Sequence, residues 1–269
     1  MRASARATIN AITPTAEYLG YVRPLIAGGD YNGDGTAEAA VFRAGAGEWI
    51  VRNVTRVPFG SAGDTPVSGD YGGDGTTEIA VYRPSQGLWE IREVTSFAFG
   101  NYSDAPVPAD YDGDGRTEPA VFSPISGTWE VRDATRLVFG TAGDRPLPGD
   151  YGGDGTAEPA VFRPSAVRWA ARGVTTFYFG SSADSPAPAD YDGDRALEAG
   201  VFRAANGLWS ARGATRTYFG GGSDQTVPAD YDGDGRSDPA LFRDSTGLWS
   251  VRPRTRVYFG SSGDAPVAK

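Results

Sequence analysis

Residues 106–140 read PVPADYDGDGRTEPAVFSPISGTWEVRDATRLVFG, and this stretch decides the fold. Glycine and proline divide it into four short segments of strand character, at about 106–110, 119–123, 128–133 and 135–140. No window has a sustained period of 3.6 residues, so we expect almost no helix. Four short strands in about forty residues match the size of one β-propeller blade.

The stretch is one unit of a repeat with a step of 40 residues and no insertion or deletion. Asp-Tyr recurs from Asp30 to Asp230, and tryptophan recurs from Trp49 to Trp249. Strands such as 120–122 are apolar on consecutive residues, as expected when both faces of a sheet are covered. We therefore predict an all-β fold, a β-propeller of four-stranded blades, over a β-solenoid, whose repeats are usually shorter. The units start near Asp30, Asp70, Asp110, Asp150, Asp190 and Asp230.

The two ends of the chain decide the expected number of blades. Residues 15–20 align with a fourth strand one period earlier than Thr55–Gly60, and residues 8–12 fall where a third strand belongs. Residues 265–268 have the sequence of a first strand with no blade after it. We therefore predict a single domain, 1–269, with a seventh blade shared between the termini, so that 1–29 and 261–269 close the ring. A six-bladed ring is the alternative.

Each unit carries an acidic loop after its first strand. Loop 110–118 reads D-x-D-x-D-G-x-x-E, with acids at positions 1, 3, 5 and 9, a turn glycine at 6 and a main-chain carbonyl at 7. Such an oxygen-rich, flexible shell is what Ca²⁺ prefers. An EF-hand would place its last acid at position 12 and flank the loop with helices. The pattern therefore predicts a calcium-clasped β-hairpin.

The six loops differ in their acids, which ranks them as sites. Asn32, Gly72 and Gly152 replace the acid at position 3, and Arg195 replaces the turn glycine, where we expect strain because the position needs a positive φ. We expect loops 110–118 and 230–238 to fill first. The predicted ligands are Asp30, Asn32, Asp34, Thr36, Glu38, Asp70, Asp74, Thr76, Glu78, Asp110, Asp112, Asp114, Arg116, Glu118, Asp150, Asp154, Thr156, Glu158, Asp190, Asp192, Asp194, Ala196, Glu198, Asp230, Asp232, Asp234, Arg236 and Asp238.

The acids are concentrated in these loops, which hold 21 of the 34 acidic residues in the chain. Like charges within nine residues repel one another unless something neutralises them. Six calcium ions would change the formal net charge from −9 to +3. Solvated Asp-Gly turns are a reasonable alternative for one loop, but six loops in register favour the metal.

The loop pattern in its strand-loop-strand setting, with the repeated Phe-Gly, resembles the FG-GAP repeats of integrin-α propellers and the related VCBS repeats of bacterial extracellular proteins. The resemblance covers residues 15–269. It implies up to six Ca²⁺ ions at the loop positions above, a secreted or extracellular setting, and a role in adhesion or ligand display. This sequence departs from the pattern in its short, uniform units and in the three loops that lack the acid at position 3.

The resemblance and the near-perfect spacing of the repeat leave three functions open. We expect a non-enzymatic, calcium-stabilised binding or adhesion module with a protein or glycan ligand. The first alternative is a carbohydrate-binding lectin, because integrin-like propellers include a mushroom lectin that binds amino sugars between blades. The second is a purely structural or engineered repeat scaffold.

Three further repeated residues are expected to have structural roles. The tryptophans could stack on sugars, but their place in every unit favours packing between blades. The arginine three residues after each tryptophan is expected to pair with the second repeated acid of a unit, the series from Asp64 to Asp264. The tyrosine beside each first loop acid is expected to pack around the loop.

Composition excludes several chemistries. The 269 residues include no cysteine, no histidine and one lysine, Lys269, so thiol nucleophiles, disulfides, cysteine-histidine zinc clusters and histidine bases are impossible. The acids outside the loops are scattered among the units, so we expect no enzyme. The net charge of −9 repels phosphate backbones and argues against nucleic acid. The apolar runs are too short for membrane insertion, and we expect a monomer.

Overall fold

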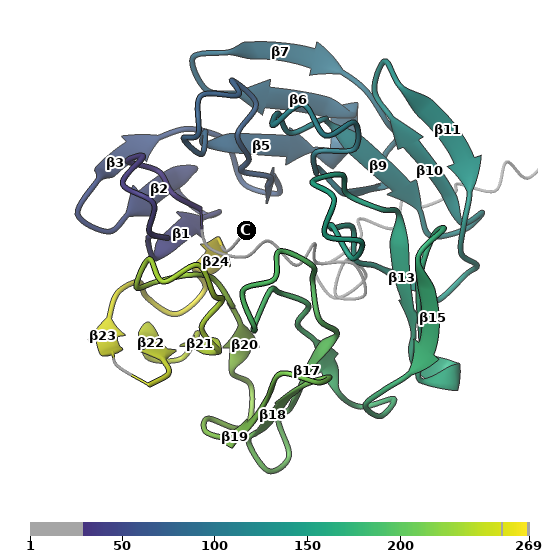
Figure 1. Ribbon diagram of the computed structural model, residues 1–269. Coiled ribbons are helices and arrows are strands. Elements are labelled where there is room, and N and C mark those ends of the chain that lie inside the picture. Colours follow the sequence, from purple (N-terminus) through teal and green to yellow (C-terminus); the bar gives the residue numbers. More distant parts are fainter. Residues whose placement is uncertain (1–28, 254, 268–269) are drawn as a thin grey trace, which may run out of the picture.

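The computed structural model describes residues 29–253 and 255–267 as six four-stranded antiparallel sheets arranged around an axis (Figure 1). The chain is therefore an all-β, six-bladed β-propeller. In each blade the first strand lies nearest the axis and the fourth forms the rim (Figure 1). Among the described residues the helical elements are the short 3-10 turns η2 (Pro84–Gln86) and η3 (Pro164–Ala166), and no helix is long and apolar enough to cross a membrane.

The blades are numbered here in chain order, each from the axis outward. Blade 1 is β24 (Ala265–Val267), β1 (Ala40–Arg43), β2 (Glu48–Val51) and β3 (Thr55–Pro58). Blade 2 is β4 (Thr65–Pro66), β5 (Ala80–Arg83), β6 (Leu88–Ile91) and β7 (Thr95–Ala98). Blade 3 is β8 (Ala105–Pro106), β9 (Ala120–Ser123), β10 (Thr128–Val131) and β11 (Thr135–Val138).

The second half of the ring repeats this order. Blade 4 is β12 (Arg145–Pro146), β13 (Ala160–Arg163), β14 (Arg168–Ala171) and β15 (Thr175–Tyr178). Blade 5 is β16 (Ser185–Pro186), β17 (Gly200–Arg203), β18 (Leu208–Ala211) and β19 (Thr215–Tyr218). Blade 6 is β20 (Gln225–Thr226), β21 (Ala240–Arg243), β22 (Leu248–Val251) and β23 (Thr255–Tyr258).

The core lies between neighbouring blades, as the consecutive apolar strands predict. In blade 2, Trp89 pairs in register with Tyr82, and their rings lie 5.2 Å apart in a tilted arrangement. Both side chains are fully buried and pack with Val121 of blade 3. All six tryptophans are buried, which confirms packing and excludes them as exposed sugar platforms.

The repeated tyrosines pack beneath the acidic loops, as expected. The hydroxyl of Tyr111 donates to the Val107 carbonyl at 2.6 Å, and that of Tyr191 donates to the Ala187 carbonyl at 2.8 Å. Because each acceptor directly follows the inner strand, β8 or β16, the bond fixes the point where the chain leaves the sheet toward the loop.

The seven-bladed prediction is wrong, and the alternative of six blades is correct. The C-terminal strand β24 pairs with β1, with Ala265 opposite Phe42 and Val267 opposite Ala40. It therefore supplies the inner strand of blade 1 rather than starting another blade. The amide of Ala37 in the first acidic loop donates to the Asp230 carbonyl in the last loop at 2.8 Å, which leaves no room for a blade between them. The strands expected at 8–12 and 15–20 lie outside the described residues.

Candidate metal centres

Each acidic loop is shaped by hydrogen bonds to its own carboxylates. In loop 110–118, the Asp110 carboxylate accepts from the amides of Gly113 at 2.6 Å and Gly115 at 2.9 Å. The carboxylate of Glu118 accepts from the Tyr111 amide at 2.7 Å. Gly115 has a φ of +90°, the conformation that glycine adopts without a steric penalty. The loop is therefore held in a tight turn with its acids facing inward.

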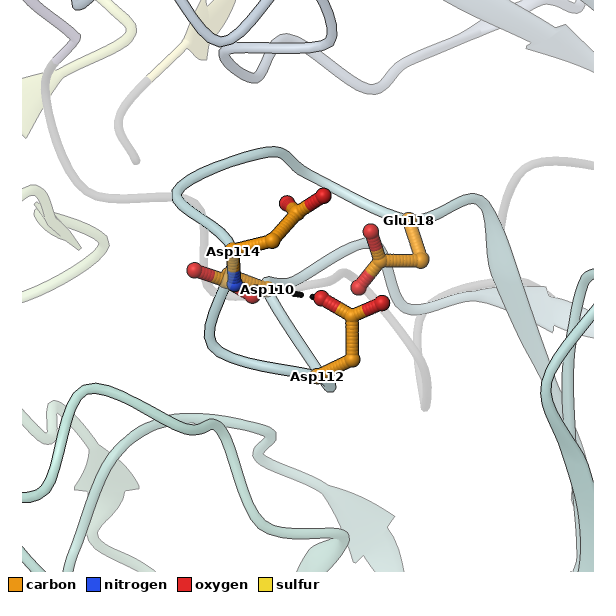
Figure 2. A group of neighbouring side chains, drawn as sticks. All are labelled: Asp110, Asp112, Asp114 and Glu118. Carbon is orange, nitrogen blue, oxygen red and sulfur yellow. Dashed lines mark hydrogen bonds between the residues drawn. The ribbon is translucent and has the colours of Figure 1, made fainter.

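The four acids of this loop converge on one small space (Figure 2). Asp110, Asp112, Asp114 and Glu118 each offer a carboxylate oxygen, and these oxygens all lie within 4.8 Å of one another. Four carboxylates and no nitrogen or sulfur ligand form the donor chemistry of a hard cation such as Ca²⁺. The residues present therefore fit a calcium ion.

The same convergence occurs around the ring. Loop 190–198 groups four acids in this way, and loops 30–38, 70–78 and 150–158 group three each. In loop 230–238 the Asp230 carboxylate accepts from the amides of Gly233 and Gly235, as in loop 110–118. In the five loops 30–38, 70–78, 110–118, 150–158 and 190–198, the structure therefore brings together every acid of the D-x-D-x-D-G-x-x-E pattern that the sequence contains.

The residues at position 7 hold the loops in a second way. The amide of Arg116 donates to Asp114 at 2.8 Å, and the amide of Thr36 donates to Asp34 at 2.9 Å. The same bond from position 7 to position 5 occurs in the other four loops, at Thr76, Thr156, Ala196 and Arg236.

The position 3 substitutions change the loops differently. The Asn32 side chain donates to the Glu38 carboxylate at 2.6 Å and accepts from the main-chain amide of Asp34 at 2.8 Å, so it joins the last acid of the loop to the main chain at position 5. A Cβ added at Gly72 or Gly152 would lie 3.4 Å from the carboxylate of the last acid in its own loop, at ordinary contact distance. An aspartate therefore fits at either glycine, and its oxygens would lie beside the existing acids.

Gathering these acids in one loop changes the pKa values of their carboxyl groups. Burial, reinforced by the neighbouring aspartates, raises the pKa of Glu118 and brings that of Glu198 to about 7. Burial likewise raises the pKa of Asp238 to about 6. By contrast, hydrogen bonds from Thr36 lower the pKa of Asp34, which is fully exposed. A bound cation would favour the ionised form of the last acid of each loop, which burial and repulsion disfavour.

The six loops form one continuous ring of hydrogen bonds. The first acid of each loop accepts, through its main-chain carbonyl, the amide at position 8 of the next loop, at 2.6–2.8 Å. The donors and acceptors are Thr77 to Asp30, Thr117 to Asp70, Ala157 to Asp110, Leu197 to Asp150, Ser237 to Asp190 and Ala37 to Asp230. The first candidate ligand of each loop therefore also joins its blade to the next, so metal binding and ring closure share this residue.

Arg195 occupies the turn position with a positive φ, as expected. Its φ is +77°, close to the +83° to +91° of the glycines at the same place in the other loops. Its amide keeps the bond to Asp190, at 2.9 Å. The loop therefore keeps its shape, and the strain is confined to one residue.

The arginine pairing expected from the sequence is wrong. The second repeated acid binds the arginine at the end of the second strand, as in the pairs Arg83–Asp64 at 3.0 Å and Arg203–Asp184 at 2.8 Å. The arginine after the tryptophan lies elsewhere: the Arg132 guanidinium is 3.7 Å from the ring centre of Phe97 in the preceding blade. The Asp-Arg pairs were missed, although a constant separation of 19 residues in four of the units was visible in the sequence.

Comparisons with known proteins support the fold. No protein-family model matches the sequence, and no curated protein matches it. A solved structure is similar with a TM-score of 0.52 and 13% sequence identity, over 89% of this chain and 79% of that chain. It is an Agrocybe aegerita lectin, described by its specific recognition of non-reducing terminal N-acetylglucosamine. At this identity the likeness concerns the fold.

Proposed function

We propose that the protein is a carbohydrate-binding propeller, a lectin in the broad sense, with no catalytic activity. The observation that carries the proposal is the shared fold: 89% of the chain aligns with a propeller that recognises N-acetylglucosamine. The absence of histidine and cysteine from the chain supports a binding role, since the usual bases and nucleophiles are missing. Adhesion to glycan-bearing surfaces would follow from the same activity.

We further propose that calcium stabilises this propeller as in FG-GAP and VCBS repeats. The convergent carboxylates of the acidic loops support the ion, and their hydrogen-bonded ring explains how it would stabilise the whole molecule. Calcium sites of extracellular modules have Kd values of roughly 10⁻⁴ to 10⁻³ M, so they fill outside the cell and stay empty in the cytosol. Secretion is therefore the expected setting.

Sugar binding is tested with calcium-loaded protein. Isothermal titration with N-acetylglucosamine and a panel of immobilised glycans should give saturable binding to at least one neutral sugar. Binding to none of the panel, by folded protein in millimolar Ca²⁺, would leave the lectin proposal without support and favour a protein ligand or a scaffold role.

A further inference from the structure

Three exposed tyrosines lie at the same place on successive blades. Tyr178, Tyr218 and Tyr258 end the rim strands β15, β19 and β23, which lie at the outside of the ring (Figure 1). They are 72%, 57% and 76% exposed. The other three blades have non-aromatic residues there, Pro58, Ala98 and Val138. Tyrosine and arginine are enriched among the residues that carry most of the binding energy at interaction surfaces.

In blades 5 and 6 each tyrosine belongs to a row that crosses the sheet. Tyr218 lies opposite Leu208, and Leu208 lies opposite Arg203. Directly opposed residues in antiparallel strands project from the same face, so the three side chains share one side of blade 5. The pKa of Arg203 is raised mainly by its bond to Asp184, and Tyr218 contributes to the same shift.

Blade 6 repeats the row with the same spacing. Tyr258 lies opposite Leu248, which lies opposite Arg243. Asp224 is the main cause of a raised pKa at Arg243, and Tyr258 again contributes. Two adjacent blades therefore present the same aromatic and guanidinium groups.

The arginines of these rows have a neutralised charge and remain accessible. Nε and Nη2 of Arg203 donate to the two carboxylate oxygens of Asp184 at 2.8 and 2.9 Å. The Asp184 side chain is fully buried, whereas the Arg203 side chain is 36% exposed. The pair Arg243–Asp224 has the same form, with the arginine 41% exposed.

The N-terminal blades differ at the same place. Arg43 and Arg83 each bind a second acid, Glu48 and Glu90. Arg163, Arg203 and Arg243 each form an ion pair with a single acid among the described residues. Blade 4 differs from blades 5 and 6 because Arg168 stands where they have leucine, and Arg163 also donates to the Thr141 hydroxyl. A guanidinium carries five N–H donors, and the bidentate pair uses two of them. The rows of blades 5 and 6 therefore keep hydrogen-bond donors beside an exposed aromatic ring.

From this arrangement we infer that Tyr218 with Arg203, and Tyr258 with Arg243, form two equivalent subsites for a neutral saccharide. The inference rests on the proposed carbohydrate-binding function and names the residues that perform it. The tyrosine ring offers an apolar face for the C–H groups of a pyranose, and the guanidinium donates to its hydroxyl oxygens. Because each arginine is neutralised by its aspartate, an anionic sugar has no advantage at these subsites.

Two copies of one subsite on adjacent blades make the binding multivalent. A surface that displays many sugars can engage both subsites, and the second contact forms at a high effective concentration. Soluble monosaccharide should therefore bind weakly, and a dense glycan surface should bind much more tightly.

The test compares Y218A, Y258A and the double variant with Y102A, in which a 52% exposed tyrosine outside the rows is removed. The probes are soluble N-acetylglucosamine and a surface that displays it densely, or the best neutral sugar of the panel if that differs. Because the three tyrosines are exposed, melting temperatures should stay within a degree or two of the native value. Each single variant should lose about threefold to tenfold in affinity for the surface. The double variant should lose on the order of 100-fold.

The outcomes separate the inference from the proposed function. If the native protein binds sugar and the double variant binds as tightly as Y102A, the subsites are wrong but the lectin proposal stands. If the native protein binds no sugar, the lectin proposal fails and the subsites fail with it. A preference for a sialylated or uronate glycan that disappears in the double variant would overturn the neutral-saccharide assignment alone.

Discussion

Removal of calcium is the perturbation with the largest expected effect on this fold. If each loop binds Ca²⁺ with a Kd of about 10⁻⁴ M, free Ca²⁺ of about 2 mM stabilises the native state by roughly 1.8 kcal/mol per filled site. The loops with four acids are 110–118, 190–198 and 230–238, and filling these three alone gives about 5 kcal/mol. That equals the whole stability of a marginal domain. The ring of hydrogen bonds spreads this effect over all six blades.

Thermal unfolding in EGTA and in 2 mM Ca²⁺ measures the effect. For a chain of this size, a loss of about 5 kcal/mol lowers the melting temperature by about 10 °C or more. The variant D114N removes one loop charge and should reduce the calcium-dependent shift. The control D133N makes the same charge change at an acid whose side chain is 85% exposed and lies outside the loops, and should leave the shift unchanged. Equal midpoints of the native protein in EGTA and in Ca²⁺ would refute the metal assignment.

Three other changes have defined outcomes. G72D supplies the missing acid at position 3 and should raise the calcium affinity of its loop several-fold in isothermal titration, because an added charged oxygen strengthens the site; weaker total binding would contradict the loop geometry. R195G should stabilise the protein by about 1 kcal/mol in urea unfolding by relieving a positive φ, and a loss of stability would show that Arg195 makes a favourable contact. A stop after Asp264 deletes β24, removes the fully buried Val267 and exposes the edge of β1. That chain should self-associate in light scattering, and a monomer with native melting would contradict closure by β24.

The blade plan was predictable because the repeat is regular. The segments expected at 119–123, 128–133 and 135–140 correspond to β9 (Ala120–Ser123), β10 (Thr128–Val131) and β11 (Thr135–Val138). The acidic loops were also predictable, because each Asp-Gly turn shapes its loop through local hydrogen bonds. The strands and acidic loops could be predicted because hydrogen bonds between residues close in the sequence form them.

The number of blades was not predictable for a geometric reason. A period of 40 residues describes one blade but not the angle between blades, and that angle decides how many close a ring. The similarity of residues 1–29 to part of a unit favoured seven. The structure closes at six because β24 takes the inner place in blade 1 and the first and last loops bind each other directly.

The arginine contacts were also not predictable from the sequence, because they depend on how separate strands and blades pack together. Arg132 follows the end of β10, and its guanidinium packs against Phe97 of the neighbouring blade rather than against an acid of its own unit. Asp184 is reached instead by Arg203, which ends the strand paired with β16. The exposed tyrosines were likewise not singled out, because only the rim position distinguishes Tyr218 from a core aromatic.

The most direct test of the account is a crystal structure of the protein grown with Ca²⁺ and N-acetylglucosamine. The account predicts an ion among the carboxylates of Asp110, Asp112, Asp114 and Glu118, and a sugar against Tyr218 and Tyr258 on the rim. Two results together would contradict the account. The acidic loops would contain no ion, and no sugar would contact Tyr218 or Tyr258 at a sugar concentration that saturates binding in solution.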